Sequence, residues 1–468
     1  MRTLRDSFKP WWTIALVSLA GCPSTVPDSD NFSAADALAT DTASALDAGA
    51  DTASAVDSGA DSEAGSAPDA GASPDTGTDA GSDADGDSGS GPDASPLDGG
   101  PTPSGPWATA VAAGGNHSCA RRANGSAWCW GSGSQGQLGT GSNGDKEKVA
   151  KPVAGLQDIA QLAAGNAHTC ARRQGGQVLC WGDRFSGQTG NGDKDGVALV
   201  PEIAGTIGDA TALGTGTYSS FAVRKGATAW GWGKNNDGQL LLDTLLSQAA
   251  PVQIAPVVDV KRLCGGEMYA CALINDGKVV CWGRNTDGQL GHGSASYDST
   301  PQPAGAVTGL PGVVDLACGH YHVCAWDGAG HAWCWGKNLS GQLGTGSYTT
   351  APVNAAIPLN GLSDVVSMAC GQGQTCAVRK NGDLLCWGSN AAGQAGAAGV
   401  ANVYTPNKID IGGKALAVST GSEHGCALRE DGAVACWGKN GNGQLGDGTT
   451  TQSAKAVVVL GSAPNAGP

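Results

Sequence analysis

The stretch that decides the fold reads Cys426-Ala-Leu-Arg-Glu-Asp-Gly432-Ala-Val-Ala-Cys436-Trp437-Gly438, followed by Gly443-Gln-Leu-Gly446. The same phrase, with substitutions, occurs seven times between residues 107 and 468. Its tryptophans recur at intervals of 51, 51, 50, 53, 52 and 50 residues and are Trp130, Trp181, Trp232, Trp282, Trp335, Trp387 and Trp437. A fixed period of this length indicates one repeat domain, although 468 residues alone would suggest about three domains.

Each repeat unit is predicted to form four β-strands. Its apolar stretches are short, are separated by Gly, Asn, Asp and Pro, and show no 3.6-residue period long enough for a helix. In a typical unit the stretches are residues 250–254, 258–263, 271–273 and 279–282. Four-stranded units repeated radially form the blades of a propeller. The predicted fold is therefore an all-β, seven-bladed propeller over residues 107–461.

The two ends of the repeat region predict how the ring closes. The first unit starts at Trp107 and lacks the Pro-Val-type strand that precedes the other units. After the last Gly-Gln-Leu-Gly, a β-rich segment follows with no further hairpin. We expect residues 453–460 to complete the first blade beside Thr109 to Ala113, which would remove an open sheet edge.

The repeated phrase resembles the repeat of the regulator of chromosome condensation (RCC1-type) family. The resemblance lies in the period, the Asp-Gly turns, Trp-Gly and Gly-Gln-Leu-Gly, and it covers residues 107–460. It implies the seven-bladed propeller of that family. The third unit departs most, reading Trp230-Gly-Trp-Gly233 and then Gly238-Gln-Leu-Leu-Leu242.

Twelve of the 16 cysteines form six pairs ten positions apart, namely Cys119 with Cys129, Cys170 with Cys180, Cys271 with Cys281, Cys324 with Cys334, Cys376 with Cys386, and Cys426 with Cys436. A three-residue hairpin loop at Glu430-Asp-Gly432 makes positions 426 and 436 cross-strand neighbours within disulfide reach. The third unit has Phe221 and Gly231 there, so both thiols are absent together. We predict six disulfides within blades, each stabilising by at most ~2–3 kcal/mol. Zinc is the alternative, but no C-x2-C spacing occurs and two thiols fill half of a tetrahedral shell.

Besides Cys22, three cysteines remain, Cys264, Cys318 and Cys370, and each precedes a glycine in consecutive units. We expect buried free thiols rather than a site. Their odd number requires at least one to be unpaired or bonded elsewhere.

Two further repeated side chains could form sites. The seven tryptophans could build a ligand cage, but their presence in every unit favours packing between blades. A metal-binding ring could come from the histidines two residues before the first cysteine, which are His117, His168, His322 and His424. Tyr269, Ser219 and Gln374 fill that place in other units, and this replacement favours local hydrogen bonding.

A leucine cluster in the third unit comprises Leu240, Leu241, Leu242, Leu245 and Leu246. It could be an exposed partner patch, but we expect burial between blades. No Walker phosphate loop, H-E-x-x-H or G-x-S-x-G occurs. The sequence therefore predicts no catalytic residue, metal or cofactor.

Residues 1–21 are predicted to be a lipoprotein signal peptide. Three basic residues precede the apolar run 11–20, which is too short to span a membrane but typical of an export signal. The run ends Leu19-Ala-Gly-Cys22, which resembles the bacterial lipobox and implies a mature N-terminus at an acylated Cys22. An ordinary signal peptide with a chance cysteine is the alternative. Because Pro23 is not the Asp that favours inner-membrane retention in enteric lipoproteins, the resemblance implies the outer membrane or cell surface of a Gram-negative bacterium.

Residues 22–106 are predicted to be a disordered stalk. The segment is almost wholly Ala, Asp, Ser, Gly, Thr and Pro, with near-duplicate decapeptides at 41–50 and 51–60, so it cannot bury enough apolar surface to offset its conformational entropy. Calcium binding by its aspartates would need a spaced loop that is absent. A disordered tail is expected over 462–468.

The net charge of −15 resides in the predicted stalk, because residues 23–106 contain 17 acidic residues and no Lys or Arg. Residues 107–468 contain 24 basic and 24 acidic residues, and the basic ones are scattered. A neutral repeat domain lacks the basic face that binds phosphates, so nucleic acid is not expected as a partner.

These features predict a monomeric, non-enzymatic binding or scaffold module, lipid-anchored at the cell envelope, whose propeller-face loops bind a protein or polymer. A secreted enzyme inhibitor is the alternative, because exported propellers similar to this family include a β-lactamase inhibitor. Guanine-nucleotide exchange fits less well, since the nuclear target and chromatin partners of the family's founding protein do not suit an exported, disulfide-rich chain. A polysaccharide-cleaving enzyme would need convergent carboxylates that the sequence does not place.

Overall fold

The structure is a computed structural model that describes residues 107–144, 146–296 and 300–462. The predicted signal peptide, Cys22, the predicted stalk and residues 463–468 lie outside the described residues. Within the part that the structure describes, no helix is long and apolar enough to cross a membrane.

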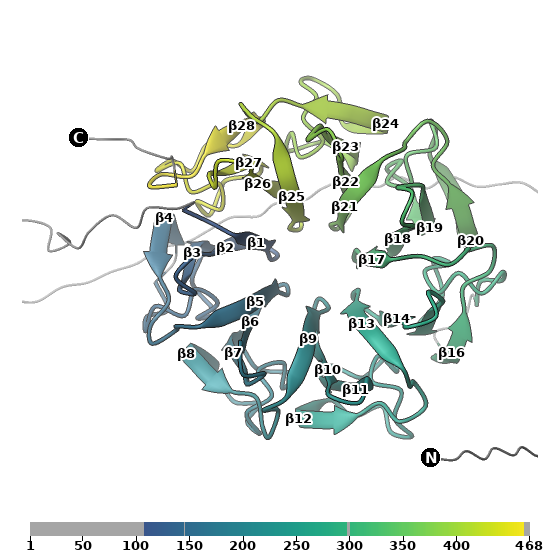
Figure 1. Cartoon of the computed structure of the whole chain (residues 1–468), viewed down its shortest axis with the longest axis horizontal. Coiled ribbons are helices and arrows are strands. Elements are labelled where there is room, and N and C mark those ends of the chain that lie inside the picture. Colours follow the sequence, from purple (N-terminus) through teal and green to yellow (C-terminus); the bar gives the residue numbers. More distant parts are fainter. Residues whose placement is uncertain (1–106, 145, 297–299, 463–468) are drawn as a thin grey trace, which may run out of the picture. The chain divides into compact units, whose positions relative to one another are not determined.

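The described residues form seven four-stranded antiparallel sheets arranged as blades around a central axis (Figure 1). The innermost strands are β1 (Ala110–Ala113), β5 (Ile159–Ala164), β9 (Ala210–Thr215), β13 (Val260–Gly265), β17 (Asp315–Cys318), β21 (Val365–Cys370) and β25 (Ala415–Thr420). The second strands are β2 (His117–Arg121), β6 (His168–Arg173), β10 (Ser219–Arg224), β14 (Tyr269–Ile274), β18 (His322–Trp326), β22 (Gln374–Arg379) and β26 (His424–Arg429).

The third strands are β3 (Ala127–Ser132), β7 (Val178–Asp183), β11 (Thr228–Gly233), β15 (Val279–Gly283), β19 (Ala332–Asn338), β23 (Leu384–Ser389) and β27 (Val434–Gly438). The outermost strands are β4 (Lys146–Pro152), β8 (Val197–Ile203), β12 (Gln248–Gln253), β16 (Gln302–Ala306), β20 (Thr349–Pro358), β24 (Asn402–Ile409) and β28 (Ser453–Val458). Each blade uses four consecutive strands. The predicted all-β, seven-bladed propeller is confirmed.

The outermost strand of each blade is an edge strand, and its composition suits that place. Proline has no backbone N–H to donate, so within sheets it is tolerated at an edge. Six of the seven outermost strands contain one, at Pro152, Pro201, Pro251, Pro303, Pro352 and Pro406. The Pro-Val-type strand therefore ends a blade rather than beginning one.

Ring closure differs from the prediction. β28 pairs with β27 of the seventh blade, placing Val457 opposite Cys436, and β1 pairs with β2. The prediction that residues 453–460 complete the first blade is wrong, because that blade already has its own outermost strand, β4. Within the described residues every blade is complete, and the first and last blades exchange no strand.

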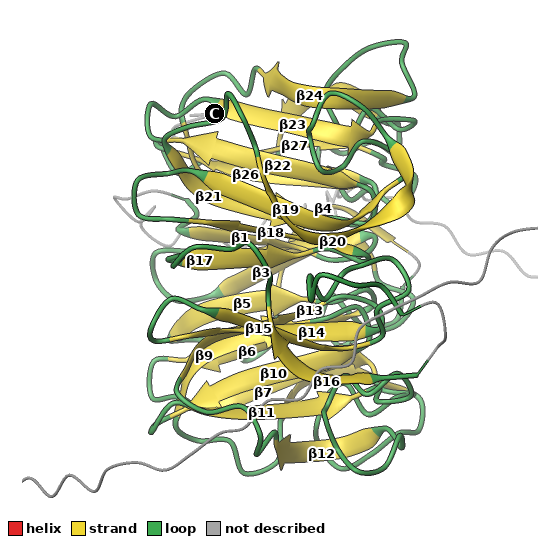
Figure 2. Ribbon diagram, turned by 90° about the vertical axis from the view of Figure 1, so that its right-hand side faces the viewer, coloured by secondary structure: helices red, strands yellow, loops and turns green. Residues whose placement is uncertain are grey.

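The two faces of the disc carry different connections (Figure 2). Because neighbouring strands run antiparallel, the turn after the first strand and the loop after the third strand lie on the same face. In the second blade these are residues 165–167 and 184–196. We call this the loop face. The opposite face, which we call the hairpin face, carries the turns between second and third strands and the links between blades.

A tryptophan–glutamine contact joins each blade to the next. All seven repeated tryptophans are fully buried. Each donates its indole Nε1–H, over 2.9 or 3.0 Å, to the backbone carbonyl of the glutamine in the Gly-Gln-Leu-Gly or equivalent loop of the preceding blade. The Trp-Gly and Gly-Gln-Leu-Gly sequences recur at a constant spacing because each blade interface needs one of each to form this contact. The tryptophans therefore pack between blades and form no open cage.

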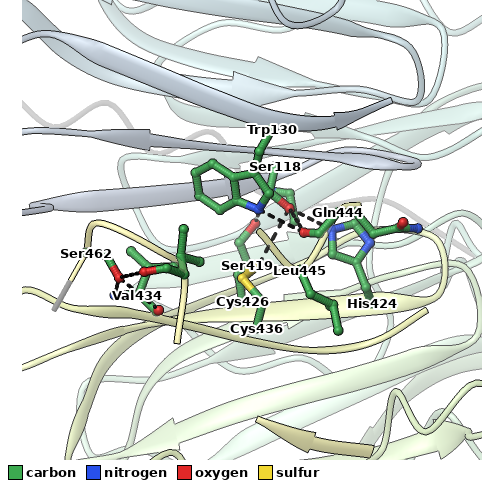
Figure 3. Close-up of a disulfide and its surroundings, with 12 residues drawn as sticks. Ser118, Trp130, Ser419, His424, Cys426, Val434, Cys436, Gln444, Leu445 and Ser462 are labelled. Carbon is green, nitrogen blue, oxygen red and sulfur yellow. Dashed lines mark hydrogen bonds between the residues drawn. A yellow bond between two sulfur atoms is a disulfide. The ribbon is translucent and has the colours of Figure 1, made fainter. Parts of the chain in front are cut away.

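The interface between the last and first blades uses the same contact. Trp130 Nε1 donates to the Gln444 carbonyl over 2.9 Å, and Ser118 Oγ donates to that carbonyl over 3.1 Å (Figure 3). His424 Nε2 lies 2.8 Å from Ser118 Oγ. The ring closes through side chains and loops between complete blades.

Candidate functional site

The six predicted disulfides are present, and each joins the second and third strands of one blade with Cα atoms 4.1 Å apart. This is close to the spacing of directly opposed residues in a non-hydrogen-bonded pair. In the third blade Phe221 lies opposite Gly231 instead. The bridges staple the hairpins that carry the loops and are structural. They join Cys119 to Cys129, Cys170 to Cys180, Cys271 to Cys281, Cys324 to Cys334, Cys376 to Cys386, and Cys426 to Cys436.

A seventh disulfide, between Cys264 and Cys318, joins the innermost strands of blades four and five, with Cα atoms 5.8 Å apart. The expectation of free thiols at these two positions is wrong. In the strand register, Cys264 lies opposite Cys271, the first cysteine of its hairpin. Cys318 lies opposite Val323, one position before the first hairpin cysteine Cys324. The two cysteines therefore occupy different positions of the repeat. Adjacent strand residues face opposite sides. Cys264 therefore faces blade five and Cys318 faces blade four.

Cys370 is the free cysteine of the described residues and is buried, as expected. It occupies the position of Cys318 in the next blade. Burial raises the pKa of its thiol to about 12. A thiol that remains protonated and inaccessible is not a reactive site.

The four repeated histidines bond across blade interfaces rather than locally. Each Nε2 lies 2.8 or 2.9 Å from a Ser or Thr hydroxyl of the next blade. In two of the other blades, Tyr269 OH and Gln374 Nε2 donate to backbone carbonyls of the next blade. Burial lowers the pKa of His117 and His322 to about 3 and of His168 and His424 to about 4, so the rings are neutral. Residues 107–144, 146–296 and 300–462 contain no cluster of three or more His, Cys, Asp or Glu side chains arranged to hold a metal ion.

A ring of glycines surrounds the axis where each innermost strand turns onto the loop face, namely Gly114, Gly165, Gly216, Gly266, Gly319, Gly371 and Gly421. A Cβ atom at any of them would come within 2.0 to 2.7 Å of a neighbouring atom. Six of the seven residues that follow these glycines donate their backbone N–H groups to carbonyls of the next blade, for example Asn166 to Thr217 and Thr217 to Gly266, both over 3.0 Å. The axial cavity measures about 80 Å³, which leaves room for water-sized groups only.

The residues two positions after each of these glycines are of six types in the seven blades. They are Asn116, Ala167, Tyr218, Met268, Tyr321, Gly373 and Glu423. Each lies beside the residue that follows Trp-Gly in its own blade. The backbone N–H of that following residue donates to the carbonyl of the residue beside it, as Lys234 does to Tyr218. These partners are Ser132, Asp183, Lys234, Arg284, Lys337, Ser389 and Lys439. The loop face therefore combines a repeated backbone with six different side-chain pairs in seven blades, because blades three and five both carry tyrosine and lysine.

Blades three to five carry the largest of these pairs. Lys234 Nζ lies 5.5 Å from the ring centroid of Tyr218, and Lys337 Nζ lies 4.4 Å from that of Tyr321. Glu267 accepts a hydrogen bond from the Tyr321 hydroxyl. These contacts hold two tyrosines at the loop face between cationic and anionic neighbours.

The same contacts shift two ionisation equilibria. The pKa of the Glu267 carboxyl is lowered, chiefly by its contact with His320, whose Nδ1 lies 3.8 Å from Oε2, and further by the hydrogen bond from Tyr321. The pKa of the Tyr321 hydroxyl is raised by burial and by Glu267. Glu267 remains a carboxylate and Tyr321 a hydrogen-bond donor at neutral pH.

A hollow of about 290 Å³ lies over blade six on the loop face. Tyr321, Lys337, Leu339 and Ser340 of blade five line one side, and Ser422 and Glu423 of blade seven line the other. Gln372, Gly373 and Ser389 of blade six also line it. A wider depression of about 540 Å³ on the hairpin face is lined by residues of 382–384 and 408–414, none of them aromatic.

The leucine cluster of the third unit is only partly buried. Leu240 is fully buried, and Leu241 and Leu242 pack against the same core. Leu245 and Leu246 are 46% and 71% exposed, so the expected burial is wrong for these two. They lie in the loop between β11 and β12, beyond the landmark glutamine that seals the interface.

Sequence reasoning missed the variable pairs and the hollow. Aligning the seven units on their Trp-Gly landmark would have shown these positions, since the flanking residues repeat and they do not. Which small residues leave a hollow depends on the neighbouring blades, and that neighbourhood exists only in the folded ring.

A closed propeller whose blades are joined by a repeated tryptophan–glutamine contact defines the class of this protein. Residues 78–357 match the RCC1-like domain, and residues 365–394 and 416–444 match the regulator of chromosome condensation (RCC1) repeat. The chain belongs to the RCC1-like domain family.

Curated relatives share the repeat region. Human E3 ubiquitin-protein ligase HERC2 is 30% identical over 276 residues, which are 56% of this chain and 6% of that protein. The mitochondrial RCC1 domain-containing protein RUG3 of Arabidopsis thaliana is 28% identical over 295 residues, 60% of this chain and 65% of that protein. The similarity thus spans a small part of the ubiquitin ligase.

Solved structures share the fold. Yeast RCC1 (Prp20) bound to Kap60 superposes with a TM-score of 0.63 at 22% identity, covering 71% of this chain and 83% of that one. Human WBSCR16 gives a TM-score of 0.64 at 20% identity, covering 72% and 94%. Prp20p of Saccharomyces cerevisiae, studied for binding to Gsp1p and histones, gives 0.64 at 19%, covering 76% and 87%.

Proposed function

We propose that the propeller is a non-enzymatic binding module that recognises a protein or polymer with its loop face. The observation that carries this proposal is the set of six different side-chain pairs that the seven blades carry on a repeated, disulfide-stapled backbone. A rigid scaffold that presents variable side chains on loops is suited to recognition. The binding of Kap60 by yeast RCC1 and of Gsp1p and histones by Prp20p supports a protein partner.

Several carboxylates of the loop face are held by lysine side chains. Glu423 is ion-paired with Lys439, Asp287 lies 3.6 Å from Lys337, and Asp237 lies 3.5 Å from Lys234. Their role is to orient the cationic and aromatic side chains of the face.

We further propose that the module acts at the cell envelope, anchored through lipid on Cys22 and separated from the membrane by the segment 23–106. The lipobox-like Leu19-Ala-Gly-Cys22 and the absence of basic residues between 23 and 106 support this. Seven disulfides support an oxidising compartment. Intact-mass measurement of the native protein tests the anchor, since an unmodified N-terminus upstream or downstream of Cys22 would contradict it.

Crosslinking of the full-length protein in its native envelope, followed by pull-down, tests the binding function. Wild type should capture a reproducible ligand, and Tyr218→Ala with Tyr321→Ala should abolish that capture. Asn360→Ala on the hairpin face is the matched control and should leave it unchanged. Capture that both variants retain would place recognition elsewhere, and no capture at all would refute the proposal.

A further inference from the structure

We propose that the hollow over blade six binds a sugar ring of a neutral glycan. This inference rests on the proposed binding function of the loop face and specifies the ligand class of one site on it.

The hollow exists because blade six carries small residues where its neighbours carry large ones. Gly373 takes the place of Tyr321 in blade five and Glu423 in blade seven. Ser389 likewise takes the place of the lysines in those blades. Two adjacent small residues between two large pairs leave a walled depression that opens on the loop face.

The charges around the hollow are already neutralised within the protein. Lys337 lies 3.6 Å from Asp287 and over the Tyr321 ring, and Glu423 is ion-paired with Lys439. An ionic ligand would have to separate these pairs, whereas a neutral ligand would not. The electrostatics therefore favour an uncharged ligand.

The polar groups left without a partner suit hydroxyl groups. Gln372 is exposed, and the side chains of Gln372, Ser340 and Ser422 make no hydrogen bond among the described residues. An amide and two hydroxyls offer both donors and acceptors. Sugar hydroxyls are both donors and acceptors as well, so each of these groups has a match.

The apolar wall suits the carbon face of a sugar ring. Tyr321 lines the hollow with an aromatic ring whose hydroxyl is held by Glu267, and the neighbouring Leu339 is 46% exposed. Fixed aromatic rings offer large contact area at low cost in conformational entropy. A flat ligand with apolar C–H groups and peripheral hydroxyls matches both parts of the lining.

The size also favours a glycan over a folded partner. A hollow of about 290 Å³ is just below the ~300–1,000 Å³ typical of small-ligand pockets. A stable protein interface buries ~800 Å² on each side, which would have to extend well beyond blade six. The hollow is of a size that suits a single sugar ring.

The test titrates the full-length protein with cellotetraose, maltotetraose and tetra-N-acetylchitotetraose, followed by saturation-transfer NMR and calorimetry. Gly373→Tyr refills the hollow with the side chain that blade five carries. A Cβ at Gly373 meets no atom closer than the Ser389 Cβ at 3.3 Å, and the backbone there is not left-handed, so the variant should fold. Ala167→Tyr, at the equivalent position of blade two, is the matched control.

At least one tetrasaccharide should bind saturably to the wild-type protein. Its affinity should be more than tenfold lower for Gly373→Tyr and unchanged for Ala167→Tyr. Gln372→Ala, which removes one exposed amide, should weaken binding several-fold and carries the test if Gly373→Tyr does not fold. Absence of binding by all three sugars, or binding that Gly373→Tyr leaves intact, overturns the glycan assignment. Envelope capture through the loop face without sugar binding would overturn this inference alone, leaving the proposed binding function in place.

Discussion

The cysteines show how a shift of one residue changes the partner of a side chain. Cys264 and Cys318 meet across an interface because one faces forward and the other backward around the ring. Cys370 repeats the position of Cys318, but the residue of blade five that corresponds to Cys264 is Ala317. Cys370 is free because its counterpart is alanine, and both residues lie in the same core between blades five and six.

Ala317→Cys should therefore form a disulfide with Cys370. Equivalent positions of a repeat share geometry, so the Cα separation should resemble the 5.8 Å of Cys264 and Cys318, which is within disulfide range. Peptide mapping without reductant should show the new cross-link and no alkylatable thiol over 107–462. Ala369→Cys is the control, because it faces Thr420 and should add a free thiol. A persistent free Cys370 in folded Ala317→Cys would contradict the assigned facing.

The buried histidines connect residue chemistry to acid stability. In the native ring their pKa values are lowered from 6.5 to about 3 or 4 by burial. Between pH 6.5 and 4 the unfolded chain therefore binds more protons than the folded one. Stability is retained above the unfolded pKa and falls as the pH decreases through this window.

We predict a loss of stability of up to ~1.4 kcal/mol per histidine per pH unit between pH 6.5 and 4. Urea unfolding at a series of pH values measures it. His322→Gln should remove about a quarter of the slope, because it removes one of the four buried histidines. The variant should fold, because blade six already has a glutamine at this position, Gln374, whose Nε2 donates to Gly421 over 2.9 Å. An unchanged slope in this variant would show that other groups govern the acid sensitivity.

At the scale of the element, the outermost strand of blade seven shows how one segment serves its own sheet and the ring. β28 pairs with β27, and the residue just after it, Val459, is fully buried in the core shared with Trp130 of blade one. Its neighbours Val458 and Leu460 are 37% and 53% exposed. The alternation fixes the register, because a slip of one residue would exchange buried and exposed side chains.

Val459→Ala should lower the free energy of unfolding by about 1.5–3 kcal/mol, the usual contribution of a fully buried valine. Leu460→Ala should change it by less than ~0.5 kcal/mol, because the side chain lies at the surface. Urea unfolding monitored by circular dichroism compares them. Equal losses in the two variants would indicate a different register for this strand.

At the scale of the whole molecule, the interface that closes the ring is equivalent to the others. Trp130 reaches Gln444 across the closing interface, and Trp181 reaches Gln137 across an internal one, each over 2.9 Å. Among the described residues, the first and last blades exchange no strand. They meet through the same tryptophan–glutamine contact that every other pair of neighbouring blades makes.

Trp130→Phe and Trp181→Phe should therefore destabilise the protein equally, to within ~0.5 kcal/mol. Each loses one indole hydrogen bond, with a net contribution of ~0.5–1.5 kcal/mol, together with packing volume. Thermal unfolding followed by circular dichroism, with the disulfides intact, measures the difference. A much smaller cost at Trp130 would indicate that blades one and seven separate before the rest of the ring unfolds.

The sequence by itself determined the features that depend on short spacings. The number of blades, their four strands and the six disulfides within hairpins follow from a repeat of 50 to 53 residues and from paired cysteines ten positions apart. Two strands joined by a three-residue turn place such cysteines opposite each other wherever the hairpin lies. No knowledge of neighbouring blades is needed for these predictions.

Only the tertiary structure decided where a blade begins and what meets across an interface. A circular repeat has the same period wherever its unit is cut, so the spacing could not show that the Pro-containing strand ends a blade. The Cys264–Cys318 bridge and the hollow at Gly373 each depend on which side of a strand faces the next blade. Those relations arise when separate units pack together, and physical contact between blades, not sequence distance, determines them.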